Sequence, residues 1–536
     1  MNRLRRALGD GRVAARQVLV LHRAGLIDVR RPADVVFAAS STRTFGPVAG
    51  PLRLSSRRDP DNVAVIDATG SVTYRELDLH TDAVAREWSA AGIGVGSVVA
   101  VMCRDHCGLI EALVVGAKVG ARVVLMNTGF GRAQFTDVAL REGVDAIVFD
   151  DEFAETVADS LGVVRRLSLK ASVESMSGEA LAPPSAQGGF VILTGGTTGT
   201  PKGVPRRVES PLAAAQFLDK VPLRRGGVTL LCAPLFHGTA LSQLILSLAL
   251  GCTVVLHGRF DAARAVAQIE RHRADAVVVV PTMLRRILDL GDALDGVDTS
   301  SLRVVFSAGA ALPTSLGDEC IRRLGPVIHN FYGCTETGTA TIATPDDWMA
   351  EPGTVGRPPL GITVRLYSEG RIVTEPGVTG TVHVGNTIAF AGYSGGGGKS
   401  ILDGLMSTGD VGHWSAGGRL FIDGRDDDMI VSGGENVFPG EVEDCLCTHP
   451  RIAEAAVIGV SDEEFGQRLS AFVVADGSVD EAQVRKYVRD GLARFKAPRD
   501  VHFVDELPRT ATGKTDRAAL AVAAERSAVR SRTRRP

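Results

Sequence analysis

Short apolar runs recur through the first half of the chain and a little beyond it, with longer segments of helical periodicity between them. The runs have the four or five residues expected of buried strands, and they are Val98–Met102, Val123–Met126, Ala146–Phe149, Val277–Val280 and Arg303–Phe306. The segment Gly108–Val119, between two of them, is predicted to be a helix. Because alternating strands and helices are typical of largely parallel sheets, the pattern predicts an α/β fold.

The pattern changes after Pro352. From there to Phe421 the apolar pieces are short, β-rich and separated by glycine and proline, and they include SGGGGKS at 394–400. The charged stretch GRDDD at 424–428 then precedes a segment of about 100 residues with its own helix and strand signals. We therefore predict a domain boundary at 424–428.

Composition narrows the class of protein. A chain of 536 residues with 45% apolar and 23% charged residues is long enough for at least two domains with a large core. The net charge of −3 gives no overall field that favours nucleic acid. The eight cysteines form no paired CxxC motifs, and no apolar run is long enough to span a bilayer. We expect a reduced, cytoplasmic protein.

The N-terminal residues 1–31 are basic and contain Arg3, Arg5, Arg6, Arg12, Arg16 and Arg23 among leucine, valine and alanine. Such a helix could lie on an anionic membrane surface as a peripheral contact. The preferred interpretation is a helix packed on its own domain, and the membrane contact remains an open alternative.

The stretch TGGTTGTPKGVPRR at 194–207 follows the apolar run Phe190–Leu193. Glycines allow a turn whose backbone N–H groups bind anions, threonines add hydroxyl donors, and Lys202 adds a positive charge. A Walker A loop does not fit, because its second glycine would fall on Thr200 or Pro201, and the dinucleotide motif GxGxxG is also missing. The stretch predicts a phosphate loop of another kind, with a flexible linker as the alternative.

Four further motifs follow in order along the chain. They are SAGAALP at 307–313, NFYGCTETG at 330–338, STGDVGHW at 407–414 and LPRTATGKTDR at 507–517. Together with the phosphate loop, these stretches resemble the signatures of the adenylate-forming superfamily, which includes acyl-CoA synthetases, the adenylation domains of nonribosomal peptide synthetases and firefly luciferase. The resemblance extends over nearly the whole chain.

The resemblance implies a nucleotide site with assigned roles. It implies that ATP is bound by Thr194, Gly195, Gly196, Thr197, Thr198, Gly199, Gly309, Ala310, Tyr332, Asp410 and Arg425. The implied catalytic residues are Lys202, Thr335, Glu336 and Lys514. Tyr332 would pack on adenine and Asp410 would accept hydrogen bonds from both ribose hydroxyls. Glu336 would hold Mg²⁺, for which a carboxylate is a suitable hard ligand, and Lys514 would lie between the substrate carboxylate and the α-phosphate.

The same resemblance implies an acyl pocket, a coenzyme A side and a hinge. The acyl pocket would be formed by Phe236, His237, Leu241, Ala308, Gly333 and Gly338, and the loop facing coenzyme A by Ser432, Gly433, Gly434 and Glu435. The implied large domain at 32–424 has two α/β subdomains and a β-rich subdomain. A hinge at 425–428, centred on Asp427, joins it to a small mobile α+β domain at 429–524, and a basic disordered tail follows at 525–536.

The predicted reaction is the ATP- and Mg²⁺-dependent activation of a fatty acid, followed by thioester formation with coenzyme A. The fatty acid is suggested by the stretch TGGTTG, which resembles the phosphate loop of long-chain fatty acyl-CoA synthetases. The mostly small or apolar side chains of the implied acyl pocket would also suit an alkyl chain. The segment PLFHGTAL at 234–241 has no acidic residue for a substrate amine, and no carrier domain is expected after Lys514, so a peptide synthetase module is disfavoured.

Several alternatives remain open. They are a CoA ligase for aryl or other acids, an acyl-AMP ligase that loads a carrier protein, a luciferase-type monooxygenase, and a non-catalytic binding homologue. The expected partners are the acid, ATP and coenzyme A, and the oligomeric state is not predicted.

Overall fold

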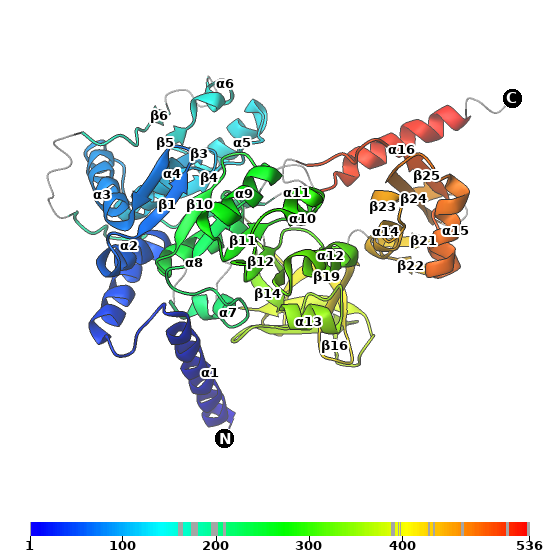
Figure 1. The fold of residues 1–536 in the computed structure, drawn as a ribbon, viewed down its shortest axis with the longest axis horizontal. Helices are drawn as coiled ribbons and strands as arrows, with labels where there is room; N and C mark the ends of the chain where they lie inside the picture. The colour runs from blue at the N-terminus through cyan, green and yellow to red at the C-terminus, as the bar shows by residue number, and fades with distance from the viewer. Residues whose placement is uncertain are drawn as a thin grey trace.

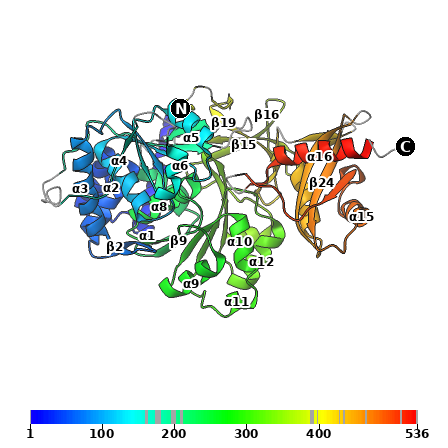
Figure 2. The ribbon, with the colours of Figure 1, turned by 90° about the horizontal axis from the view of Figure 1, so that it is seen from above.

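The computed structural model describes residues 2–158, 164–172, 181–194, 202–206, 211–386, 392–394, 396, 398–426, 429–432, 435–462, 466–510 and 514–532. Figure 1 shows a large body built on several sheets and a smaller domain, formed by the last hundred or so residues, beside it. The view from above in Figure 2 shows the same separation. The predicted architecture, a multi-sheet large domain with a small C-terminal domain, is therefore confirmed.

The first sheet has the strand order β6-β5-β3-β4-β7-β8 and is parallel except for β8 at its edge. Its strands are β3 (Val98–Met102), β4 (Arg122–Leu125), β5 (Ala146–Phe149), β6 (Arg165–Arg166), β7 (Phe190–Thr194) and β8 (Lys202–Arg206). The phosphate-loop stretch therefore begins where a buried strand ends, as its apolar prefix predicts.

The second sheet has the order β14-β13-β12-β11-β9-β10-β1-β2, with antiparallel pairs only at its two edges. Its strands are β1 (Val63–Asp67), β2 (Gly70–Thr73), β9 (Val228–Leu231), β10 (Thr253–Leu256), β11 (Ala276–Val279), β12 (Val304–Ser307), β13 (Ile328–Cys334) and β14 (Gly338–Ala343).

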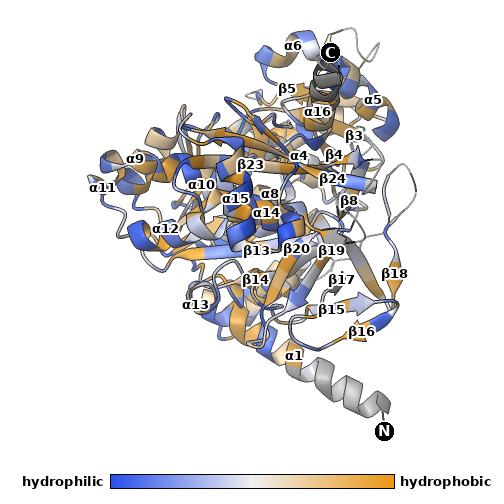
Figure 3. Ribbon diagram, turned by 90° about the vertical axis from the view of Figure 1, so that its right-hand side faces the viewer, coloured by the Kyte–Doolittle hydropathy of each residue, from blue (hydrophilic) through white to orange (hydrophobic). Residues whose placement is uncertain are grey.

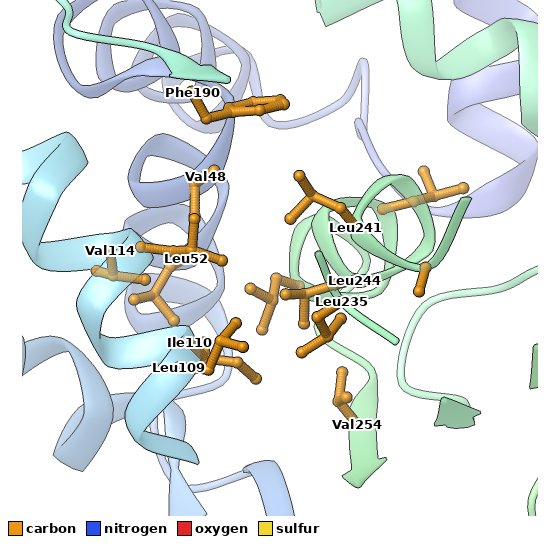
Figure 4. Close-up of a cluster of buried hydrophobic side chains, with 14 of the residues drawn as sticks. Val48, Leu52, Leu109, Ile110, Val114, Phe190, Leu235, Leu241, Leu244 and Val254 are labelled. Atoms are coloured by element: carbon orange, nitrogen blue, oxygen red, sulfur yellow. The ribbon is translucent and has the colours of Figure 1, made fainter. Parts of the chain in front are cut away.

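One hydrophobic core joins the two sheets through the helices that pack between them. These helices are α2 (Pro32–Arg58), α3 (Tyr74–Ala90), α4 (Cys107–Val119) and α8 (Gly238–Ala249). Figure 4 shows Leu52 of α2, Ile110 of α4 and Leu244 of α8 directed toward one another. Burial of such aliphatic side chains stabilises the fold by about 25 cal/mol per Å² of apolar surface. The helices that cover the outer faces and edges of the two sheets are α5 (Arg132–Glu142), α6 (Ala154–Val157), α9 (Ala262–His272), α10 (Pro281–Leu288), α11 (Asp292–Asp295) and α12 (Thr314–Leu324).

The β-rich segment predicted after Pro352 forms a third, antiparallel sheet. Its strands are β15 (Thr363–Ser368), β16 (Arg371–Val373), β17 (Gly380–Gly385), β18 (Ile401–Leu402), β19 (Leu405–Trp414) and β20 (Leu420–Arg425). The short elements α7 (Ala215–Leu218), α13 (Pro345–Ala350) and the 3₁₀ turns η1 (Asp151–Phe153) and η3 (Pro211–Ala214) complete the large domain.

The small domain is an α+β unit on a fourth sheet. It contains β21 (Ile430–Ser432), β22 (Glu435–Val437), α14 (Pro439–Cys447), β23 (Ile452–Asp462), β24 (Gly466–Ala475), α15 (Glu481–Gly491), η4 (Arg494–Lys496), β25 (Asp500–Phe503) and α16 (Arg517–Arg532). Val484 and Val488 of α15 are buried against this sheet, while Figure 3 shows α15 largely hydrophilic on the side toward the viewer.

The two ends of the chain are helical. At the N-terminus α1 (Asn2–Ala24) projects from the large domain. Its last turns pack on that domain through the buried Leu21 and Ala24, in agreement with the preferred interpretation of a helix packed on its own domain. At the C-terminus α16 continues to Arg532, so residues 525–532 of the predicted disordered tail are helical. Its alanine-rich sequence has a high helix propensity. Along the described parts of the chain, no helix combines the length and the apolar character that a bilayer span requires.

Candidate active site

A continuous cavity of about 3080 Å³ extends from the cleft between the two domains into the large domain. Its walls include Val280, Gly309 and Cys334, which lie at the carboxyl ends of the parallel strands β11, β12 and β13. Ligands of open α/β sheets bind at this edge. The cavity exceeds the roughly 300–1,000 Å³ of a single small-molecule site, so it has room for more than one ligand.

The predicted ribose and adenine residues meet on one wall of this cavity. The Tyr332 hydroxyl donates to Asp410 Oδ2 at 2.6 Å, and its oxygen lies 3.1 Å from Thr408 Oγ1. Asp410 and Arg425 are cross-strand neighbours on β19 and β20, and their side chains approach to 3.9 Å. Burial raises the pKa of Asp410, against the hydrogen bond from Tyr332 and the charge of Arg425. Gly309 and Ala310 line the same cavity.

The predicted magnesium ligand lies in the turn between β13 and β14. Thr335 and Glu336 both line the cavity, and the Glu336 side chain is buried. Glu336 Oε1 accepts a hydrogen bond of 2.6 Å from the Tyr393 hydroxyl. The Lys202 ammonium lies 5.1 Å from the centre of the Tyr393 ring. Tyr393 therefore links the predicted phosphate-binding lysine to the predicted metal-binding carboxylate.

The segment that carries Tyr393 is fixed to β8. The Ser394 backbone N–H donates to the Gly203 carbonyl at 2.9 Å, and its hydroxyl donates to Glu142 Oε1 at 2.5 Å. Burial, together with the hydrogen bond to Glu336, raises the pKa of the Tyr393 phenol, which therefore stays a donor at neutral pH. No motif in the sequence singles out Tyr393, because its two contacts come from residues far away along the chain.

The small domain contributes Lys514 to the same cavity. This residue lies in a turn closed by the Thr510 N–H, which donates to the Lys514 carbonyl at 2.7 Å. Desolvation lowers the pKa of Lys514 and the charge of Arg425 lowers it further, whereas the carboxylates of Asp410 and Glu336 raise it. The structure thus brings together Lys514 and the nucleotide-site carboxylates, which lie in different domains.

The predicted acyl residues lie beside Lys514. Those on the cavity wall are Phe236, His237, Leu241, Gly333 and Gly338. His237 precedes α8 and contacts the Phe236 ring at a centroid distance of 4.4 Å. Burial and then the charge of Lys514 lower the pKa of His237 to about 4, so its imidazole is neutral at pH 7. Ala308 is fully buried in the main core, so the structure places it behind the wall of the cavity.

Some predicted residues cannot be placed. Gly195, Gly196, Thr197, Thr198, Gly199, Asp427, Gly433 and Gly434 lie outside the described residues, as do the side chains of Thr194 and Glu435. Ser432 is described in the β21–β22 hairpin and lies outside the described lining of the cavity. The roles of these residues stay predictions.

A second cluster of chemically active side chains lies apart from these residues. Cys103, His106 and Asp150 place one ligand atom each within 4.8 Å of the others. His106 Nε2 donates to Asp150 at 2.9 Å, and its Nδ1 accepts from the Gly108 N–H at 3.0 Å at the start of α4. Because both ring nitrogens have protein partners, we interpret this cluster as a helix cap.

Comparison with known proteins identifies the family. The AMP-binding enzyme family matches residues 52–394, and the AMP-binding enzyme C-terminal domain matches residues 441–514. A 2-succinylbenzoate–CoA ligase of Bacillus licheniformis is 31% identical over 476 residues, which are 86% of this chain and 97% of the relative.

Solved structures give the same result. The o-succinylbenzoate CoA synthetase of Bacillus subtilis, in complex with its acyl-adenylate, has a TM-score of 0.78 and 28% identity, over 88% of this chain and 97% of that one. The anthranilate CoA ligase AuaEII with anthranoyl-AMP has a TM-score of 0.81 and 26% identity, over 89% of this chain and 98% of that one. These names support the aryl-acid alternative better than the fatty-acid prediction.

The expected cofactors also agree with the comparisons. The Bacillus subtilis enzyme has been solved with ATP and a magnesium ion, and coenzyme A is the cosubstrate of CoA ligases. The donor set described above fits these groups, since it offers a buried carboxylate for the metal and lysines for phosphate oxygens. With a family match over more than half of its length and this assembled site, the chain belongs to the AMP-binding enzymes of the adenylate-forming (ANL) superfamily.

Proposed function

We propose that the protein joins a carboxylic acid with an aromatic group to coenzyme A through an acyl-adenylate, with release of pyrophosphate and AMP. The observation that carries this proposal is the meeting of Lys514, Glu336 and Asp410 in one cavity. A lysine of one domain beside two carboxylates of the other is the arrangement of charges that a reaction between two anions requires. The aromatic character of the acid comes from the names of the relatives.

The first step joins two anions. A carboxylate oxygen of the acid attacks the α-phosphorus of ATP, and the bond to pyrophosphate breaks. Lys514, which neighbours both His237 and the carboxylates, would reduce the repulsion between the two anions and stabilise the transition state. Glu336 would hold Mg²⁺, which screens the triphosphate charge when bound. The neutral His237 would border the acid without adding charge.

The second step needs a different arrangement of the small domain. The thiolate of coenzyme A attacks the acyl carbon of the adenylate, and AMP leaves. In this structure Lys514 occupies the cavity and Ser432 lies outside its described lining, an arrangement suited to adenylation. We propose that a turn at 425–428 withdraws Lys514 and presents the β21–β22 hairpin for the second step.

The test is an assay of the purified protein with ATP, Mg²⁺ and coenzyme A. A panel of aryl, fatty and amino acids is offered, and AMP and thioester are both recorded. We expect AMP and thioester in equal amounts with aryl acids. AMP without thioester for every acid would favour a ligase that loads a carrier protein, and thioester only with unsubstituted fatty acids would refute the aromatic assignment.

A further inference from the structure

One face of α8 lines the cavity along the whole helix. The lining residues repeat mostly at spacings of three and four, as one helical face requires, and they are Gly238, Thr239, Leu241, Ser242, Ile245, Leu246 and Ala249. At 1.5 Å per residue this face is about 16 Å long. It begins beside His237, where the carboxylate of the acid would lie. We call the part of the cavity that follows this face of α8 the tail-binding branch. A benzoate placed beside His237 would leave most of this branch unfilled.

The far end of the branch is closed by the N-terminal helices. Leu21 of α1 and Leu26 and Ile27 after it line the cavity, as do Ala38 and Thr42 of α2. All of these residues precede position 52, where the family match begins. This part of the wall therefore belongs to a segment that the matched family domain does not include.

The wall formed by α2 is sharply bent. Gly46 has φ +78° and ψ −175°, which interrupts the helix and turns its second half back against the first. The two halves cross so closely at Gly50 that a Cβ there would lie 2.6 Å from Thr42 Cα. Gln187 Nε2 donates to the Thr42 carbonyl at 3.0 Å, and Asp34 at the start of α2 pairs with Arg58 at its end, at 3.2 Å.

The described walls of this branch carry no charged side chain. The residues that line the cavity on α8 and α2, and at Leu21, Leu26 and Ile27, are all uncharged. The arginines of α2 are not among the residues that line the cavity: Arg53 stacks on the Phe45 ring at 4.6 Å, and Arg57 and Arg58 pair with Asp34. The name 2-succinylbenzoate denotes a dicarboxylate, and burying its second charge here would be costly.

We infer that α1 and α2 form a specificity wall for an aromatic acid that has one carboxylate and an extended apolar tail. The tail lies along α8 and ends against Leu21, Ala38 and Ala249. This inference rests on the proposed function and narrows its substrate class.

The test compares two neighbouring alanines of α2 in the full-length protein. Ala38 lines the cavity and Ala39 is exposed, so Ala38→Phe fills the far end of the branch and Ala39→Phe is its matched control. The specificity ratio is kcat/KM for phenylundecanoate divided by kcat/KM for phenylacetate. We expect the wild type and Ala39→Phe to favour phenylundecanoate, and Ala38→Phe to lower the ratio at least about tenfold. Ala249→Phe, on the opposite wall, should act in the same direction.

The outcomes separate the inference from the function on which it rests. Thioester formation with a wild-type preference for phenylacetate, or an unchanged ratio in both cavity variants, would overturn the inference and leave the proposed function standing. If no acid yields AMP, the proposed function fails. The binding affinity for phenylundecanoate, measured by calorimetry, then still tests the specificity wall. If the wall contacts the tail, phenylundecanoate binds to the wild type and binds more weakly to Ala38→Phe.

Discussion

Short hydrogen bonds from tyrosines orient the two carboxylates that are predicted to bind the ribose and the magnesium ion. Tyr332 donates to Asp410 and Tyr393 donates to Glu336, both at 2.6 Å. A carboxylate without such a partner can rotate about its last side-chain bond, whereas one that accepts a short hydrogen bond keeps one orientation. We therefore expect Tyr393 to act as a positioning residue, since it supplies no charge to the reaction.

Replacement of Tyr393 by phenylalanine tests this role. Tyr393→Phe keeps the ring near Lys202 and removes the hydrogen bond to Glu336. We expect kcat for adenylation to fall about tenfold, or about 1.4 kcal/mol, as for the loss of a hydrogen bond to a charged group, with an altered Mg²⁺ dependence. Pyrophosphate release measured at several Mg²⁺ concentrations checks this.

Tyr367→Phe is the matched control for that experiment. The Tyr367 hydroxyl donates to the Asp403 carboxylate at 2.9 Å. Tyr367 lies in the same sheet as Asp410, but the Asp403 carboxylate does not line the cavity. We expect this variant to keep its Mg²⁺ dependence. Equal effects of the two substitutions would argue against a positioning role for Tyr393.

His413 provides a prediction on pH. Its Nδ1–H donates to Asp423 at 2.8 Å, and this bond raises the pKa of His413 against the effect of burial. The folded-state pKa of His413 lies above its unfolded-state value of about 6.5, so the protonated imidazole stabilises the folded protein. This stabilisation is complete below pH 6.5 and is lost as the pH rises through the folded-state pKa. His413→Gln should therefore cost more unfolding free energy at pH 6 than at pH 9, measured by urea unfolding. The same cost at both values would show that the charged form of His413 adds nothing.

At the scale of elements, the sequence predicts buried strands well. The ranges Val98–Met102 and Ala146–Phe149 match β3 and β5 residue for residue, and the helix predicted at Gly108–Val119 begins only one residue late. Their signal is local, since a buried parallel strand is a run of apolar residues between turns. The contact of Tyr393 with Glu336 has no such signal, because the sheets bring these residues together across 57 positions. The lining role of α1 and α2 is hidden for the same reason.

The bend in α2 supplies a prediction on stability. Gly50→Ala places a methyl group against the Thr42 backbone, which cannot yield as a flexible side chain could, so we expect a loss of about 1–3 kcal/mol in unfolding free energy. In Gly11→Ala, on the exposed part of α1, the new Cβ meets no atom within 4 Å, and we expect a neutral or slightly stabilising effect. Thermal unfolding of both variants checks this, and equal melting temperatures would refute the tight crossing.

At the scale of the whole molecule, the resemblance of the motifs predicts that residues of both domains serve one site. Lys514 lies far from Glu336 along the chain, and the fold brings it to the cavity that Glu336 lines. The tail-binding branch is likewise a property of the assembled domain, since its walls come from α1, α2, η3, α7 and α8.

If adenylation and thioester formation use different arrangements of the two domains, Lys514 should act only in adenylation. In Lys514→Ala no cation lies between the acid and the α-phosphate, so we expect adenylation to fall about 100- to 1,000-fold, as for the loss of a transition-state donor. Thioester formation from supplied acyl-adenylate should be unchanged, because the lysine has then left the cavity. Lys486→Ala, at an exposed position of α15 in the same domain, is the matched control and should keep both rates. If Lys514→Ala slows both half-reactions equally, Lys514 remains in the cavity for the second step and the proposed turn of the small domain is wrong.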